Sequence, residues 1–221
     1  MPREAAKLAD LLADARVWRL KDTSAAPPPR PVWPTGCDAL DARLPGGGWP
    51  AASLVEVLLD EAGLGEIELF LPAFAASQRG SGEGGIQEIP WLAWISPPYE
   101  PYAPALAQQG IELERLLVVR PATATEALWA AEQLLSSGVC AAVLLWLKGT
   151  DDRWLRRLKL AAEAGGALGV LFRPERHRFE PSPAPLRVLL RRGVEEPHLE
   201  LLKVRGGQPG PIAPRAMASP S

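Results

Sequence analysis

The sequence predicts an α/β fold built on a mostly parallel sheet that is sandwiched by helices. Apolar stretches of strand length alternate with stretches of helical periodicity along most of the 221 residues. The stretch 139–147 is apolar at every position, which is typical of a central parallel strand buried on both faces. Alternating strands and helices form a parallel sheet joined by right-handed crossovers. No helical stretch separates 186–190 from 199–204, which predicts an antiparallel edge at the C-terminal end.

The front of the chain is predicted to be a helix followed by a stiff connector. Residues 3–20 fit an amphipathic helix. The apolar residues at helical spacing on it include Leu8, Leu11, Leu12 and Trp18. Residues 25–34 are rich in proline, which has no N–H to donate and disfavours helical geometry in the residue before it. The apolar side chains of the helix either pack against the rest of the chain or contact a second copy, so a homo-oligomer stays an open alternative.

The remaining elements follow from the same patterns. The predicted strands are 53–59, 91–95, 116–119, 139–147, 168–172, 186–190 and 199–204. The predicted helices are 37–43, 65–78, 103–109, 123–136 and 151–164. Thr123 and Glu126 have the spacing of a capping box, which marks the start of one of these helices. We therefore divide the chain into a front unit at 1–34, a core at 35–205 and a tail at 206–221 that its composition predicts to be disordered.

Composition restricts the class of protein. A hydrophobic fraction of 47% suffices for a real core, and a charged fraction of 23% is ordinary for a soluble protein. The net charge of -2 gives no global signal for nucleic acid, but residues 151–221 hold 13 Lys and Arg against 8 Asp and Glu. Cys37 and Cys140 predict buried reduced thiols, and so few cysteines and histidines argue against a metal site. No apolar signal segment or membrane-spanning run is present, which predicts a cytoplasmic protein.

The stretch 54–71 has the order of a phosphate-binding loop. An apolar strand leads into a turn that carries Gly63 and Gly65, and a helical pattern follows. In such loops, backbone N–H groups and the N-terminus of the helix face an anion. The alternative is that both glycines simply serve a tight turn between strand and helix.

Five stretches of the core carry a family resemblance. They are T-G-C-D-A-L-D-A-R-L-P-G-G-G-W-P (35–50), W-I-S-P-P-Y-E-P-Y-A-P-A-L-A-Q-Q-G-I-E-L-E-R-L-L-V-V-R (94–120), L-W-A-A-E-Q-L-L-S-S-G-V-C-A-A-V-L-L-W-L (128–147), A-A-E-A-G-G-A-L-G-V-L-F-R-P (161–174) and S-P-A-P-L-R (182–187). Together, over about residues 32–205, they resemble RecA-type recombinase cores. The chain is most similar to the ImuA family, a RecA-like and SulA-like branch associated with translesion DNA synthesis. The resemblance implies a RecA-like sheet with a degenerate phosphate-binding loop (P-loop).

The residues of the loop argue against ATP chemistry. An ATPase of this fold needs a lysine for the phosphates and a hydroxyl for magnesium directly after the last loop glycine. Those positions hold Glu66 and Ile67, or Gly65 and Glu66 in a register without a gap, so a carboxylate stands beside the triphosphate in either case. Trp146 takes the place of the magnesium-holding aspartate, and Pro98 aligns with the glutamate that would position water. We therefore expect no catalysis and no nucleotide cofactor.

Basic residues of the C-terminal third are the candidates for contact with a partner or DNA. Those on the predicted helix 151–164 are Arg153, Arg156, Arg157 and Lys159. Those that follow are Arg187, Arg191, Arg192, Lys203 and Arg205. Such residues either meet a phosphate backbone or an acidic protein, or form no more than a solvated face.

The resemblance implies a non-catalytic accessory or scaffold protein of SOS-type translesion DNA synthesis. Members of the ImuA family bind ImuB, an inactive relative of Y-family polymerases, and through it an error-prone C-family polymerase and the sliding clamp. Contacts with RecA or DNA are also compatible with this role. The C-terminal part of the family is implicated in binding ImuB, which points to residues from about 182 on. Three alternatives stay open: a nucleotide-binding RecA-like ATPase or switch, a SulA-type inhibitor of cell division, and a DNA-binding protein.

Overall fold

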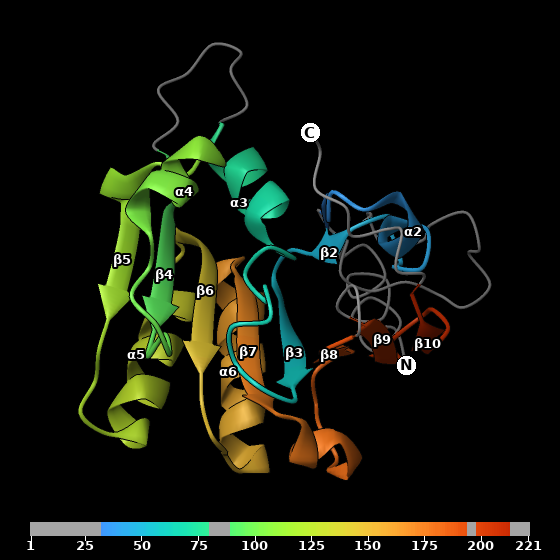
Figure 1. Ribbon diagram of the computed structural model, residues 1–221. Coiled ribbons are helices and arrows are strands. Elements are labelled where there is room, and N and C mark those ends of the chain that lie inside the picture. The colour runs from blue at the N-terminus through green and yellow to red at the C-terminus, as the bar shows by residue number, and fades with distance from the viewer. Residues whose placement is uncertain (1–31, 80–88, 194–197, 213–221) are drawn as a thin grey trace, which may run out of the picture. The chain divides into compact units, whose positions relative to one another are not determined.

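A computed structural model describes residues 32–79, 89–193 and 198–212. Its centre is an eight-stranded sheet in the order β10-β9-β8-β3-β7-β6-β4-β5. The strands from β8 to β5 in this order run parallel, and β9 and β10 add an antiparallel edge (Figure 1). This confirms the predicted α/β class and the antiparallel C-terminal edge. The strands are β3 (Ser53–Leu59), β4 (Trp91–Ile95), β5 (Leu116–Val119), β6 (Cys140–Trp146), β7 (Leu168–Pro174), β8 (Leu186–Arg191), β9 (His198–Val204) and β10 (Gly210–Pro211).

Helices cover both faces of this sheet (Figure 1). One face, here called the α5/α6 face, packs against α5 (Ala124–Ser136) and α6 (Asp152–Gly165). The opposite face, the α3/α4 face, packs against α3 (Leu71–Gln78) and α4 (Ala103–Gln108) and is rich in stacked aromatic rings. The short elements are β1 (Val32–Trp33), α2 (Asp38–Asp41), β2 (Trp49–Pro50), η1 (Leu113–Arg115) and η2 (Glu175–Phe179).

The two central strands behave as their composition predicts. Every residue of β3 and of β6 is buried, because helices lie on both sides of them. Alternate residues of a strand point to opposite faces. In β3 this directs Val55 and Val57 to the α3/α4 face and Leu54 to the α5/α6 face. Glu56 shares the parity of Leu54, so a carboxylate is buried on the α5/α6 side.

Local signals at the helix ends match the structure. Thr123 accepts a hydrogen bond from the main-chain N–H of Glu126, whose side chain accepts from the N–H of Thr123, which confirms the capping box. Asp151 caps α6 through the N–H of Trp154, at 2.8 Å. Gly166 ends α6 in left-handed geometry, with φ of 75°. Such caps satisfy backbone groups that have no partner within the helix.

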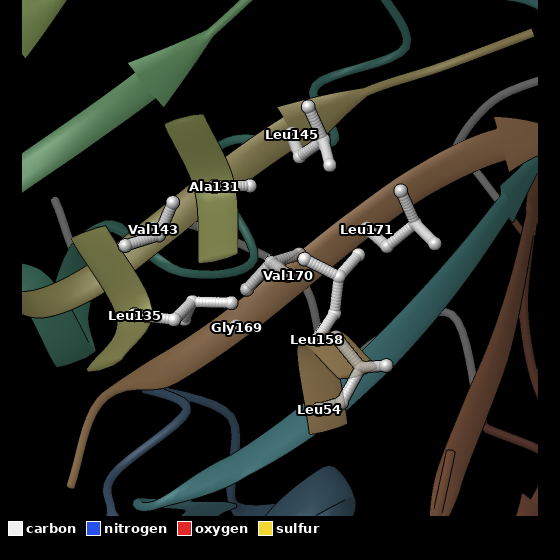
Figure 2. A pocket seen from close by; sticks show the side chains of 9 residues that line it. All are labelled: Leu54, Ala131, Leu135, Val143, Leu145, Leu158, Gly169, Val170 and Leu171. Atoms are coloured by element: carbon white, nitrogen blue, oxygen red, sulfur yellow. The ribbon is translucent and has the colours of Figure 1, made fainter. Parts of the chain in front are cut away.

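The α5/α6 face is packed almost without voids. Figure 2 shows apolar side chains of β3, β6 and β7 converging with those of α5 and α6 around one small space. Its volume is about 10 Å³, about one water-sized sphere. Its lining is apolar, so it has no groups to hold a water or a polar ligand. A Cβ at Gly169 would lie 3.1 Å from Leu54 and 3.3 Å from Leu135, so a side chain there would require these two leucines to shift by a few tenths of an ångström.

Three predicted boundaries need correction or restriction. The connector does not extend to Pro34, because Val32 and Trp33 already pair with Pro50 and Trp49. The chain is not disordered from Gly206 on, because Gly210 and Pro211 pair with β9 and Ile212 is buried beside it. The predicted helix at 3–20, with Leu8, Leu11, Leu12 and Trp18, lies outside the described residues, as does the tail after 212. In the described part of the chain, no helix is long and apolar enough to span a membrane.

Candidate functional site

The loop that leaves β3 closes on a carboxylate of its own. Gly63 and Gly65 hold left-handed geometry, with φ of 88° and 83°, which favours glycine. The main-chain N–H of Gly63 donates to Glu66, 3.0 Å from Oε2 and 3.3 Å from Oε1. The indole Nε1 of Trp146, at the end of β6, lies 3.4 Å from the same Oε1. Glu66 is 3% exposed.

No cation balances this buried carboxylate within the described ranges. Neither a lysine, an arginine nor a histidine among them lies within 4.0 Å of Glu66. Its partners are instead a backbone N–H and an indole N–H, the kinds of donor that anion-binding loops offer. Trp146 is fixed by stacking on Phe172, with ring centroids 4.6 Å apart. The side chain of Glu66 thus takes up both of these donors.

The helix predicted at 65–78 is wrong in its first part. Residues 66–70 form successive turns, and α3 begins only at Leu71. By that point the chain has run back along the sheet, as Figure 1 shows. The indole of Trp49, which lies before β3, donates to the carbonyl of Leu69 at 2.9 Å and stacks on Phe70. The N-terminus of α3 therefore lies near the amino end of β3 and not at its glycine loop, so no helix dipole faces the loop.

A second buried carboxylate lies on the opposite face of the sheet. Glu56 is 0% exposed and pairs with two arginines. Arg173 of β7 donates from Nη1 to Oε1 at 2.6 Å, and Arg187 of β8 donates from Nε to Oε2 at 2.6 Å. The strand order places β3 between β7 and β8, so the three side chains meet directly. Each oxygen of this buried carboxylate is thus both paired with and hydrogen-bonded to a guanidinium, which offsets the cost of burying the charge.

The two arginines also hold the short helix η2 in place. Arg187 donates to three main-chain carbonyls, those of His177 at 2.9 Å, Arg178 at 3.1 Å and Glu180 at 3.1 Å. Arg173 donates to the carboxylate of Glu180 at 3.0 Å. The backbone of η2 is therefore held in place by two buried arginine side chains of the sheet.

His177 joins η2 to the loop after β6. Its Nε2 lies 3.0 Å from the carbonyl of Lys148, and its Nδ1 lies 2.8 Å from Oε1 of Glu180. Both facing atoms are oxygens that can accept a hydrogen bond. The contact with His177, together with Arg173, holds the pKa of Glu180 below its ordinary value.

Most of the predicted basic residues of α6 are engaged with carboxylates. Arg156 pairs with Asp152 one turn earlier, and Arg157 pairs with Glu132 of α5 and lies over the ring of Trp154. Lys159 lies 3.6 Å from Glu163. Arg153 is exposed and forms no ion pair in the part of the chain that the structure describes. Leu155 and Leu158 face the sheet, as predicted.

The later basic residues fall into different settings. The prediction that Arg187 belongs to a binding surface is wrong, because the residue is 7% exposed and bound to Glu56. Arg191 pairs with Glu175, which holds the pKa of that carboxyl below its ordinary value. Arg192 pairs with Glu61. Arg192, Lys203 and Arg205 are exposed, and Nζ of Lys203 donates to the carbonyl of Ser182.

Sequence reasoning missed the buried network at η2. Glu56, Arg173 and Glu180 were not among the predicted site residues. A signal exists for the first, since Glu56 is the one charged residue in the run L-V-E-V-L-L. A charged residue inside a strand that is otherwise apolar needs a buried partner. The remaining predicted positions are Ile67, which packs against the α3/α4 core, and Pro98, which is exposed after β4.

The fold and this site define an α/β protein with a mostly parallel central sheet, antiparallel strands at one edge, and a strand-end loop closed by its own carboxylate. No protein-family model matches the chain. Protein ImuA of Caulobacter vibrioides is 30% identical over an alignment that covers 82% of each chain. The chain belongs to the ImuA family.

SulA proteins are the second group of relatives. The cell division inhibitor SulA of Edwardsiella piscicida is 32% identical over 49% of this chain, and the chain spans 64% of the length of that protein. The crystal structure of SulA from Pseudomonas aeruginosa is 25% identical with a TM-score of 0.43, and the match covers 57% of this chain and 99% of that one. The resemblance to an ImuA and SulA-like family is thereby confirmed.

Proposed function

We propose that the protein is a non-catalytic accessory factor of the DNA-damage response. Membership of the ImuA family supports this role. In the finer form of the proposal, it acts as a scaffold in translesion synthesis. It binds ImuB and, through ImuB, an error-prone C-family polymerase and the sliding clamp.

One observation supports the non-catalytic part of the proposal. The carboxylate of Glu66 takes up the N–H of Gly63 and the indole N–H of Trp146. A triphosphate at this loop would meet a buried negative charge, and like charges at close range repel. The loop is then the remnant of a RecA-like phosphate-binding loop. It still forms the turn after β3, and the Glu66 carboxylate takes the place of the phosphate.

Two measurements test the proposal separately. Titration with Mg-ATP up to millimolar concentration is expected to give no saturable heat and no shift in Tm, because a ligand that binds only the folded state raises its stability. A pull-down with purified ImuB is expected to recover a complex. Saturable ATP binding would overturn the non-catalytic part, and failure to bind ImuB would overturn the scaffold part.

A second candidate function rests on the SulA relatives. Their similarity covers about half of this chain, so a SulA-type block of cell division is an alternative outcome of the same fold. Overexpression in cells that lack ImuB and its polymerase separates the two functions. Filamentous cells under those conditions would favour the inhibitor, and normal division together with ImuB binding would favour the scaffold.

The two remaining alternatives have less support. A nucleotide-gated switch has to displace Glu66 from its donors. A DNA-binding surface on α6 has to use cations of which three already pair with carboxylates. Binding of a single-stranded oligonucleotide that weakens steeply with salt would revive the second of these.

A further inference from the structure

The helix η2 presents an exposed aromatic ring that plays no part in the core. Phe179 is 87% exposed, more than any other large apolar residue of the described chain. The guanidinium of Arg178 lies 5.0 Å from the centroid of its ring and is the contact that orients it. An exposed phenylalanine costs solvation free energy in the free protein. Aromatic side chains of this kind are common as the central contacts of protein interfaces.

The backbone beneath Phe179 is rigidly supported. Arg187 binds the carbonyls of residues 177, 178 and 180, and Arg173 binds the carboxylate of Glu180. Both arginines are fixed in turn by Glu56. A partner that docks here does not have to order this segment, which lowers the entropic cost of association. Burying the charges of Glu56, Arg173 and Arg187 costs solvation free energy. The resulting network also fixes the position of η2 at the surface.

A recess lies beside the exposed ring. It has a volume of about 400 Å³ and is open to solvent. It is lined by Asp60, Pro174, Glu175, Arg176, Arg178 and Phe179. Asp60 directly follows the parallel strand β3 and Pro174 ends β7, so the recess lies at the carboxyl edge of the sheet, where open α/β sheets commonly bind their ligands. Pro174 and Phe179 are the two apolar residues of this lining, which offers a contact for one apolar side chain, and the other four lining residues are charged.

Charge indicates what surrounds that side chain. Arg176 is exposed, and its Nη2 donates only to the carbonyl of Lys148, at 2.7 Å. Neither Arg176 nor Lys148 forms an ion pair within the ranges that the structure describes, and the hydrogen bond brings them together. The nearby carboxylates of Glu175 and Glu180 are already paired with Arg191 and Arg173. Two cations without an ion pair match one or two carboxylates of a polypeptide, whereas a phosphate backbone is bound by many cations at once.

We propose that η2, together with Lys148, is the docking surface for an acidic segment of a partner protein that carries one apolar side chain. The apolar side chain enters the recess beside Phe179, and a carboxylate of the segment faces Arg176 and Lys148. The inference rests on the proposed scaffold function, because it assigns that function a surface. It differs from the sequence-based expectations, which placed candidate contacts on the helix 151–164 and, from the resemblance, from about residue 182 on.

Binding of the full-length protein to purified ImuB tests the proposal. Phe179→Ala is expected to weaken binding roughly tenfold or more, as truncation of a central aromatic contact does. Arg176→Glu is expected to weaken it several-fold, by an amount that shrinks at high salt because screening reduces the charge contribution. The matched controls are Tyr102→Ala, another exposed aromatic at 72%, and Arg79→Glu, an exposed arginine after α3. Both controls are expected to change binding less than twofold, and thermal unfolding should show all four variants folded.

The outcomes distinguish the inference from the function on which it rests. If the unaltered protein does not bind ImuB, both fail. If it binds and Phe179→Ala binds equally well, the docking surface is overturned while the scaffold function stands. A fluorescent single-stranded oligonucleotide serves as a second probe. If Phe179→Ala and Arg176→Glu weaken its binding and leave ImuB binding unchanged, the surface is a nucleic-acid site and the proposal is overturned.

Discussion

Two buried glutamates on opposite faces of the sheet, Glu56 and Glu66, are held in different ways. Glu56 has two arginine partners, both nearly buried, and these continue to the backbone of η2. Glu66 has no cationic partner among the described residues, only a backbone N–H and an indole. The first pairing sets an exposed element in position, whereas the second fills a loop. Buried charge in this fold therefore does two things: it supports an exposed element, and it closes a loop.

The largest effect is expected from Glu56→Gln. The substitution leaves Arg173 and Arg187 as buried charges without a carboxylate, which costs roughly 3–5 kcal/mol. Urea unfolding should show this as a lower midpoint with the slope unchanged. The variant should also lose affinity for ImuB, because η2 is no longer anchored. A loss below about 1 kcal/mol would show that the two arginines do not depend on Glu56.

Glu66→Ala should have a smaller effect. It leaves the N–H of Gly63 and the indole of Trp146 without their acceptor, which costs roughly 1–3 kcal/mol. Glu66→Gln keeps one acceptor oxygen and should cost less. Both are measured by urea unfolding. A Glu66→Ala protein as stable as the unaltered one would mean that this carboxylate does not close the loop, and the contrast with Glu56 would disappear.

Acid should weaken the η2 network through Glu180. Its pKa is lowered in the folded protein, first by His177 and then by Arg173. A lowered folded pKa gives stability that is present above the unfolded value and is lost as the pH falls through the folded one. The loss of stability should begin below about pH 4.5, which is the ordinary pKa of this carboxyl. Stability measured from pH 6 to pH 3 should fall less steeply in Glu180→Gln, and equal slopes would contradict the assignment.

The smallest effect is expected from Glu61→Gln, the surface counterpart of the buried substitutions. Glu61 pairs with Arg192, and the two side chains are 50% and 68% exposed. Pairs this exposed contribute about 0–1 kcal/mol because water and salt screen them. Urea unfolding should barely separate the variant from the unaltered protein. A loss as large as that of Glu56→Gln would show that burial does not set the strength of these pairs.

The sequence predicts the sheet well because strand signals are local. Runs such as 139–147 and 53–59 are apolar throughout, and Thr123 with Glu126 marks a helix start within four residues. It predicts the loop poorly. The pattern at 65–70 has helical spacing, but Phe70 stacks on Trp49, a contact that local periodicity does not reveal. Sequence comparison identifies Glu66 as an obstacle to phosphate, and only the structure shows what the carboxylate binds instead.

The η2 network is hidden from sequence for a related reason. Glu56 lies 117 residues from Arg173 and 131 residues from Arg187. The pairing follows from the strand order, which places β3 between β7 and β8. Nothing in the local composition of η2 shows that its carbonyls accept hydrogen bonds from Arg187 of the sheet.

The same distance along the chain has a consequence for biosynthesis. Arg187 is on β8, which emerges from the ribosome after β3, β6 and β7, yet it is the residue that binds the carbonyls of η2. Arg187 is itself held by Glu56, 131 residues earlier in the chain, and contacts of such long range slow folding. A nascent or truncated chain that ends before β8 therefore lacks a fixed η2. Under the docking proposal, only molecules that have completed the sheet would recruit the partner through η2.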